Sequence, residues 1–251
     1  MSVAYDNVGP SSSGTAKGPV ATGTTAGSTD LTWMHTCGSS PTLALFVGVG
    51  VSSEDSTDSK YTVTVTYNGV SMTSLGLVHT NDSTAGFVQL FALLNPATSG
   101  NTVDVHVAWS AGPADNLYVE GGSVSFTGVN QTTGWQNVNS NYGYSTSPSV
   151  SITSSSGDMV IDAVANGSAI STSNQTLRWN DNFTSNGAGG NAAQSTAAGA
   201  TSVSMGYSVA SDYWGIIGAD VIAAGAAFQP DEDFFSPMLP PAADPAVMVF
   251  Q

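Results

Sequence analysis

Positive charge is the scarcest property of this sequence. Its 251 residues include only 3 lysines and arginines against 18 acidic residues, a formal net charge of −15 at pH 7. So few cations cannot neutralise the phosphates of nucleic acid or hold the chain on an anionic membrane surface. We therefore expect no nucleic acid and no membrane among its partners, and mutual repulsion between molecules favours solubility.

Cysteine and long apolar runs are also nearly absent. Cys37 is the single cysteine, so no disulfide forms within the chain, and we interpret it as a small, half-buried apolar residue. No apolar run approaches the roughly 18 residues of a membrane-spanning helix. The opening MSVAYDNVGPSSSG has neither the basic first segment nor the apolar second segment of a secretory signal. We therefore expect release by cell lysis, as for virion proteins.

Motifs for catalysis and metal binding are missing. No histidine has the three or four neighbouring ligands of a zinc site, although His35 stands near Cys37 on one predicted strand. There is no nucleophile elbow, phosphate loop or dinucleotide fingerprint. We expect no enzyme activity, no cofactor and no metal.

Several acidic residues are candidates for catalysis or for metal binding. Asp158 and Asp162 share one strand face, with Asp212 and Asp220 in a similar later region, and we interpret all four as turn or solvent-facing residues. In the stretch 52–60, three acidic side chains offer oxygen ligands for Ca²⁺. An ordinary acidic hairpin loop is the interpretation we favour there, because the calcium-loop spacing of an EF-hand is absent.

The sequence is rich in β-strand patterns from about residue 29 to residue 224. Alternating apolar residues predict strands with one buried face at 61–67, 101–109 and 201–209. Asn68 and Gly69 predict a tight hairpin turn after the first of these. Continuously apolar runs predict strands covered on both faces at 42–51, 86–94, 117–126, 157–165 and 214–224. The fold class is therefore all-β, a two-sheet, jelly-roll-like sandwich.

The chain divides into three parts by composition. Residues 1–27 predict an N-terminal strand or arm, 28–224 the sandwich, and 225–251 an extended tail. A faint internal repeat relates about 28–128 to 145–224. These halves form either one jelly roll or two small sandwiches, and we favour one domain because the second half has few strong strands.

Two long stretches predict loops, and one contains aromatic residues. The stretch 181–200 is rich in Gly, Ala and Asn, and 128–148 holds Trp135, Tyr142 and Tyr144 among Asn and Gln. Flat rings beside amides are typical of sugar binding, so these three aromatics are candidate glycan contacts. The alternative is that the rings fold back over a sheet edge.

Several motifs carry a resemblance to a known family. The stretches GGSVSFTGVNQTTGW (121–135), SPSVSITSSSGDMVIDAVA (147–165) and WGIIGADVIAA (214–224) resemble jelly-roll-like β-sandwich domains of tailed-phage virion proteins and some bacterial surface proteins. The resemblance covers roughly residues 28–224. It implies a structural role as a minor tail or appendage protein or as a capsid decoration protein, and it transfers no catalytic residue.

The C-terminal tail lies outside that resemblance. Its prolines exclude a helix or a central strand and favour extended chain. An extended chain cannot bury its own apolar side chains, so we predict an assembly arm that docks on a neighbouring subunit or on the sandwich itself. The docking residues are Phe234, Phe235, Met238, Leu239, Val247, Met248 and Phe250.

These observations lead to one hypothesis and two alternatives. The hypothesis is a non-enzymatic structural protein of a tailed-phage virion, located in the virion, whose partners are other copies of itself and other virion proteins. The first alternative is a carbohydrate-binding or adhesion module that contacts a host surface glycan through Trp135, Tyr142 and Tyr144. The second is a polysaccharide-active enzyme, for which no motif is present.

Overall fold

A computed structural model describes most of the chain. The described residues are 1–9, 16–18, 27–53, 61–80, 86–110, 117–182 and 190–225. Their regular structure is β-strand throughout, and every strand pairing is antiparallel. None of them forms a helix that is long and apolar enough to cross a membrane. The predicted all-β, jelly-roll-like sandwich is confirmed, with more sheets than the two that we expected.

The N-terminal half forms two sheets. The inner N-terminal sheet has, in spatial order, the strands β1 (Ala4–Gly9), β10 (Leu117–Thr127), β4 (Ala44–Ser53), β8 (Gly86–Leu94) and β7 (Thr73–His79), with β2 (Ala16–Gly18) also beside β10. The outer N-terminal sheet has the strands β3 (Gly27–Cys37), β9 (Ser99–Trp109), β5 (Tyr61–Tyr67) and β6 (Val70–Ser71).

The C-terminal half forms two more sheets. The inner C-terminal sheet has the strands β11 (Trp135–Ser145), β18 (Asp212–Val221), β13 (Met159–Asn166), β16 (Asn191–Ala198) and β15 (Thr176–Asn182). The outer C-terminal sheet has the strands β12 (Ser149–Ile152), β17 (Val203–Val209) and β14 (Ile170–Ser173).

Both halves have the same strand topology. Setting aside the short β2 and β6, the described part of each half has eight strands. In each half the inner sheet has the chain order 1-8-3-6-5 and the outer sheet 2-7-4. A jelly roll has eight strands in two sheets, which is the arrangement that each half approaches. The molecule is therefore two sandwiches of one design, where we had favoured a single one.

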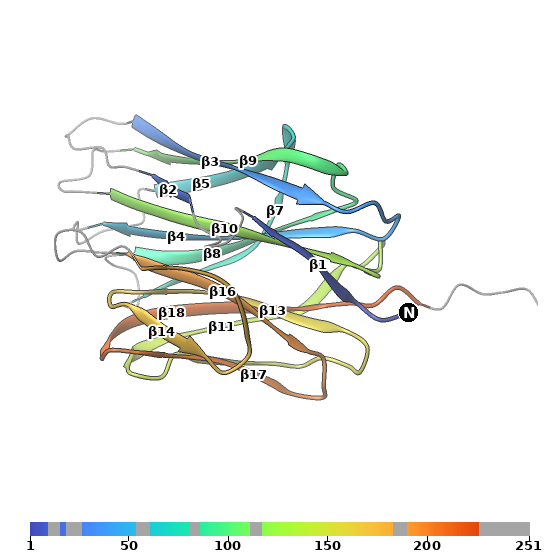
Figure 1. The fold of residues 1–251 in the computed structure, drawn as a ribbon. Coiled ribbons are helices and arrows are strands. Elements are labelled where there is room, and N and C mark those ends of the chain that lie inside the picture. Colours follow the sequence, from blue (N-terminus) through green and yellow to red (C-terminus); the bar gives the residue numbers. More distant parts are fainter. Residues whose placement is uncertain are drawn as a thin grey trace, which may run out of the picture.

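The four sheets stack as four layers, with the two inner sheets against each other (Figure 1). Each gap between layers holds its own apolar core. Successive residues on the inner strands enter different cores: Ile216 packs in the C-terminal core and Ile217 in the middle one. This explains the continuously apolar runs, because an inner strand is covered on both faces.

The alternating strands behave as predicted. Tyr61, Val63, Val65 and Tyr67 of β5 are all buried, whereas the threonines between them face outward or are half-buried. The hairpin turn that follows has positive φ at both central positions, 50° at Asn68 and 74° at Gly69. That is the geometry of the type I′ turn, which Asn-Gly favours.

Two stretches predicted as loops contain strands instead. The stretch 128–148 contains β11, an edge strand whose side chains are mostly exposed, so no apolar alternation reveals it. The stretch 181–200 contains β16, whose buried side chains are mainly small. Small residues are needed there because the inner sheets approach closely: a Cβ added to Gly50 of β4 would lie 2.9 Å from the Cβ of Ala192. The loop predictions were therefore wrong for 135–145 and 191–198.

Candidate functional site

The three predicted glycan contacts all lie on β11, but the structure separates them. The ring of Trp135 is half-buried and packs edge-to-face on Phe46, with ring centroids 6.2 Å apart. It therefore belongs to the middle core, which matches the alternative that a ring folds back over a sheet edge. Tyr142 and Tyr144 are 47% and 62% exposed.

A third tyrosine joins these two. Tyr213 on β18 pairs with Tyr144 in the strand register, is 48% exposed, and packs with its ring centroid 4.9 Å from that of Tyr144. Tyr142 and Tyr144 are two residues apart on one strand, so they face the same side of the sheet. We name Tyr142, Tyr144 and Tyr213 the aromatic strip. The sequence contains no local signal for Tyr213, because it stands just before the apolar run 214–224 and only strand pairing brings it beside Tyr144.

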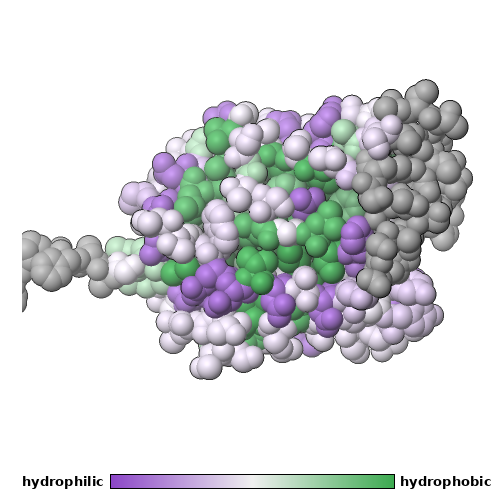
Figure 2. Space-filling model, turned by 180° about the vertical axis from the view of Figure 1, so that it is seen from behind, coloured by the Kyte–Doolittle hydropathy of each residue, from purple (hydrophilic) through white to green (hydrophobic). Residues whose placement is uncertain are grey.

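Tyr142 and Tyr144 belong to β11, which lies at the back of the molecule as drawn in Figure 1. There β7 and β11, the edge strands of the two inner sheets, run beside each other, whereas β1 crosses the front. Figure 2 shows that apolar residues gather in the middle of this back face. Leu77 of β7 and Val138 of β11 are among the exposed apolar residues of these edge strands. The back face is thus the candidate binding surface of the described chain.

The asparagines beside the aromatic strip have a structural task. Asn139 and Asn141 of β11 donate through Nδ2 to the carbonyl oxygens of Ser151 and Ser149 on β12, at 3.0 and 2.9 Å. Their Oδ1 atoms accept from the next backbone N–H along β11. These amides join the edges of two sheets, so they are not available to bind sugar hydroxyls as we had expected.

The acidic residues that we expected at the surface are buried instead. Asp162 on β13 is fully buried in the C-terminal core. Its Oδ1 accepts from Ser195 N at 2.8 Å, Ser195 Oγ at 2.7 Å and the Tyr207 hydroxyl at 2.7 Å, and its Oδ2 from Gln175 Nε2 at 3.3 Å. Burial raises the pKa of Asp162 to about 7. The hydrogen bonds from Ser195 and Tyr207 act in the opposite direction and lower the pKa.

A carboxyl group with a pKa near 7 is suited to general acid–base catalysis, but a substrate must be able to reach it. Asp162 has no exposed surface, its neighbours Ser195 and Tyr207 are buried as well, and Gln175 is partly buried. The arrangement is a buried polar cluster that ties β13, β16 and β17 together. Its partners are all satisfied, as buried charges and amides require.

Asp158 and Asp220 also do not face solvent, because their carboxylates accept hydrogen bonds from other segments of the chain. Asp220 is buried and accepts from Ser154 Oγ at 2.6 Å and Gln136 Nε2 at 2.9 Å, and burial raises its pKa. Asp158 accepts from the backbone N–H of Ala223 at 2.7 Å. The prediction of turn or solvent-facing residues was therefore wrong for Asp162 and Asp220, which are buried within strands. Asp158 closes a turn, since its backbone N–H donates to Ser155 O at 3.1 Å, but it is buried as well.

A second buried cluster surrounds His35 between the two N-terminal sheets. Its Nδ1 lies 2.8 Å from Ser123 Oγ and its Nε2 3.0 Å from Ser125 Oγ, and Ser125 donates to Asp6 at 2.7 Å. Burial lowers the pKa of His35 to about 4, so the imidazole is neutral at pH 7. In a catalytic triad the carboxylate orients the histidine. Here the Asp6 carboxylate contacts Ser125 and not His35, so the carboxylate cannot orient the histidine for activation of a nucleophile.

Metal and thiol chemistry find no support in the described ranges. They contain no group of three or more His, Cys, Asp or Glu side chains that could hold a metal ion. Cys37 is fully buried rather than half-buried, and burial raises the pKa of its thiol to about 11. A thiol in this state is a poor nucleophile at neutral pH.

Two predicted sites fall outside the described residues. The assembly arm, residues Phe234 to Phe250, belongs to the stretch 226–251, and the acidic loop belongs to 54–60. The predictions for both stretches stay predictions.

No known protein family, curated protein or solved structure matches this chain. The jelly-roll-like fold is therefore established by the strand order itself. The resemblance to virion sandwich domains stays a prediction from the motifs.

Proposed function

We propose that this chain is a non-enzymatic structural protein of a tailed-phage virion, either a minor tail or appendage protein or a capsid decoration protein. The observation that carries the proposal is the repeated sandwich, in which two eight-stranded units share a third core. A stack of this kind is suited to serve as a rigid building block of a larger assembly. The resemblance of its strand and turn motifs to virion sandwich domains supports the same role.

The buried polar clusters also favour a structural role. Two of the titratable groups with strongly shifted pKa values, Asp162 and His35, are enclosed by side chains that join neighbouring strands. Perturbed groups often mark active sites, but they also occur in structural networks. Enclosure without a reachable nucleophile or substrate cleft supports the structural alternative for these two.

We propose that residues 225–251 act as the assembly arm and dock on a neighbouring subunit. The test is the solution mass of the full chain and of a chain that ends at Gly225, measured by light scattering on a sizing column. We expect a defined oligomer for the first and a folded monomer for the second. Equal monomers of equal stability would contradict self-assembly through the arm.

Carbohydrate binding is the second candidate, and the aromatic strip favours it. Exposed tyrosines at a sheet edge offer flat faces to a sugar ring. The informative substitution is Tyr144→Ala, with loss of binding on a glycan array expected. Trp135→Ala would not discriminate, because that ring packs on Phe46 and its removal disturbs the middle core.

A further inference from the structure

A pocket of about 140 Å³ lies at one end of the contact between the two inner sheets. Both sandwiches build it. The N-terminal half contributes Ser52 of β4, Thr80 after β7 and Glu120 of β10. Because its walls come from two folding units, this pocket exists only in the assembled stack, which is a common position for ligand sites.

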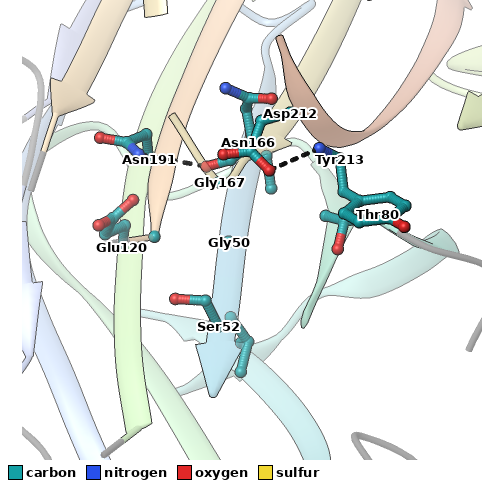
Figure 3. A pocket seen from close by; sticks show the side chains of 12 residues that line it. Gly50, Ser52, Thr80, Glu120, Asn166, Gly167, Asn191, Asp212 and Tyr213 are labelled. Carbon is teal, nitrogen blue, oxygen red and sulfur yellow. Dashed lines mark hydrogen bonds between the residues drawn. The ribbon is translucent and has the colours of Figure 1, made fainter. Parts of the chain in front are cut away.

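The C-terminal half contributes amides, a carboxylate and a ring. Asn166, Asn191, Asp212 and Tyr213 line the pocket from β13, β16 and β18. In Figure 3, Glu120 and Asn191 lie on one side and Tyr213 on the other. Tyr213 is half-exposed, so this wall reaches the molecular surface, and it also belongs to the aromatic strip.

The strongest sign of a ligand is an amide oxygen in the pocket wall. Asn166 is only 2% exposed, and its Nδ2 donates to the carbonyl oxygen of Ser168. Its Oδ1 is buried and has no hydrogen-bond partner among the described residues, and the same holds for the Oγ of Ser52. Buried polar atoms are nearly always paired, so each such atom in a pocket wall calls for a partner.

The remaining polar groups define what that partner must offer. Asp212 is held in place, because its carboxylate accepts from the Tyr213 backbone N–H at 2.8 Å and from Ser168 Oγ at 2.6 Å. Glu120, a buried carboxylate, adds acceptor oxygens to the opposite wall. Acceptors dominate, and no cationic side chain is among the described residues that line the pocket, so these residues favour a ligand with several donors over an anionic one.

Size and shape narrow the ligand class. Sites for drug-sized molecules measure roughly 300–1,000 Å³, so a pocket of about 140 Å³ takes one small ring. A pyranose offers several hydroxyl donors and an apolar ring face for Tyr213. A metal ion is a poorer fit, because the described residues contain no cluster of ligating side chains and the wall includes a ring.

We propose that this pocket binds one neutral pyranose unit of a glycan. Its hydroxyls donate to Asn166 Oδ1 and to Glu120, and its ring face contacts Tyr213. The rest of the glycan follows the aromatic strip toward Tyr144 and Tyr142. The inference goes beyond the assembly role and stands whether or not the chain forms part of a virion.

The test is titration of the full-length protein with glucose, galactose, mannose and N-acetylglucosamine, followed by calorimetry and saturation-transfer NMR. N-acetylneuraminic acid serves as the anionic comparison. We expect at least one neutral sugar to bind at millimolar concentration and the anionic sugar not to bind. Tyr213→Ala should weaken binding by about tenfold, the effect of removing one ring contact.

Two further variants keep the test decisive. Glu120→Gln preserves the shape of the pocket wall while removing its charge, so it should weaken sugar binding. This variant tests the proposal independently if Tyr213→Ala disturbs folding. Val70→Ala, at a residue that is 52% exposed on β6 in the outer N-terminal sheet, is the matched control and should bind as the unmodified chain does. Thermal unfolding of each variant verifies that it folds.

Three outcomes would overturn the inference. The first is that none of the four neutral sugars binds. The second is that binding persists unchanged in both Tyr213→Ala and Glu120→Gln. The third is that Ca²⁺ or an alkylammonium ion occupies the pocket in place of sugars. A chain that binds no sugar but still forms a defined oligomer through its tail would leave the assembly proposal intact.

Discussion

At the scale of single residues, two buried titratable groups shift stability in opposite directions. Asp162 has its pKa raised to about 7 by burial, and His35 has its pKa lowered to about 4. A raised carboxyl pKa means that the folded state binds its proton more tightly than the unfolded chain does. A lowered histidine pKa means the reverse.

The Asp162 carboxyl should make the protein less stable as pH rises from about 4 to 7. The folded state holds the proton over this range whereas the unfolded chain has released it, so the free energy of unfolding falls by on the order of a few kcal/mol. Asp162→Asn removes this dependence. Urea unfolding at a series of pH values measures it, and parallel curves for the two proteins would contradict the assignment.

His35 supplies the internal control for that experiment. Its neutral, buried imidazole should lower stability as pH falls from 6.5 toward 4, because only the unfolded chain gains the proton readily. In the unmodified chain this loss partly cancels the gain from Asp162 over the same range. In Asp162→Asn the His35 effect remains and is opposed by Asp220, whose pKa is also raised by burial. Relative to the unmodified chain, the stability of this variant should therefore rise from pH 4 to 6.5.

At the scale of elements, the contact between β4 and the inner C-terminal sheet depends on small residues. A Cβ added at Gly48 would lie 2.9 Å from the Cβ of Ala163 and 3.3 Å from the Trp179 ring. Ala192 of β16 is likewise buried in this contact, whereas Ala193 is buried in the C-terminal core. This explains why β16 has a strand's geometry without the bulky apolar residues by which strands are usually recognised.

Gly48→Val should therefore destabilise the protein by about 1–3 kcal/mol, the usual cost of inserting volume into a packed core. Denaturant unfolding measures the loss. Val70→Ala on the exposed hairpin is the control, with a change within about 0.5 kcal/mol expected. A Gly48→Val variant as stable as the unmodified chain would contradict this, because it would mean that the two inner sheets can move apart locally without lowering the free energy of unfolding.

At the scale of the whole molecule, the two sandwiches behave as one body because they share a core. Phe46, Phe126 and Ile217 from both halves meet in the middle core. At the edges formed by β1 and β15, the Arg178 guanidinium lies 3.8 Å from the ring centroid of Tyr5. One of the three cations of the chain thus bridges the two halves.

We expect the full chain to unfold in one cooperative transition rather than two. Separating the sandwiches exposes the middle core, so neither half retains its stability alone. Scanning calorimetry tests this through the ratio of calorimetric to van't Hoff enthalpy, which should be about one. Phe46→Ala should lower the whole transition, with a loss of about 3–5 kcal/mol. Two resolved transitions, with only one shifted by Phe46→Ala, would contradict the shared core.

The sequence alone determined the strand faces and the fold class. Period-two alternation over 61–67, 101–109 and 201–209 identifies strands that are buried on one face. Continuous apolar runs identify strands that are buried on both faces, because each buried face requires apolar side chains. The Asn68–Gly69 turn follows equally directly, since few other residue pairs tolerate its positive φ values.

Only the tertiary structure decided which polar residues are buried and where a ligand can bind. Ser195 and Tyr207 are 33 and 45 residues from Asp162 in the chain, so no local pattern reveals their contact. The pocket draws Glu120 and Asn166 from different sandwiches. Burial of a polar side chain depends on partners that strand pairing and sheet stacking bring together, and those long-range contacts are absent from the local pattern of residues.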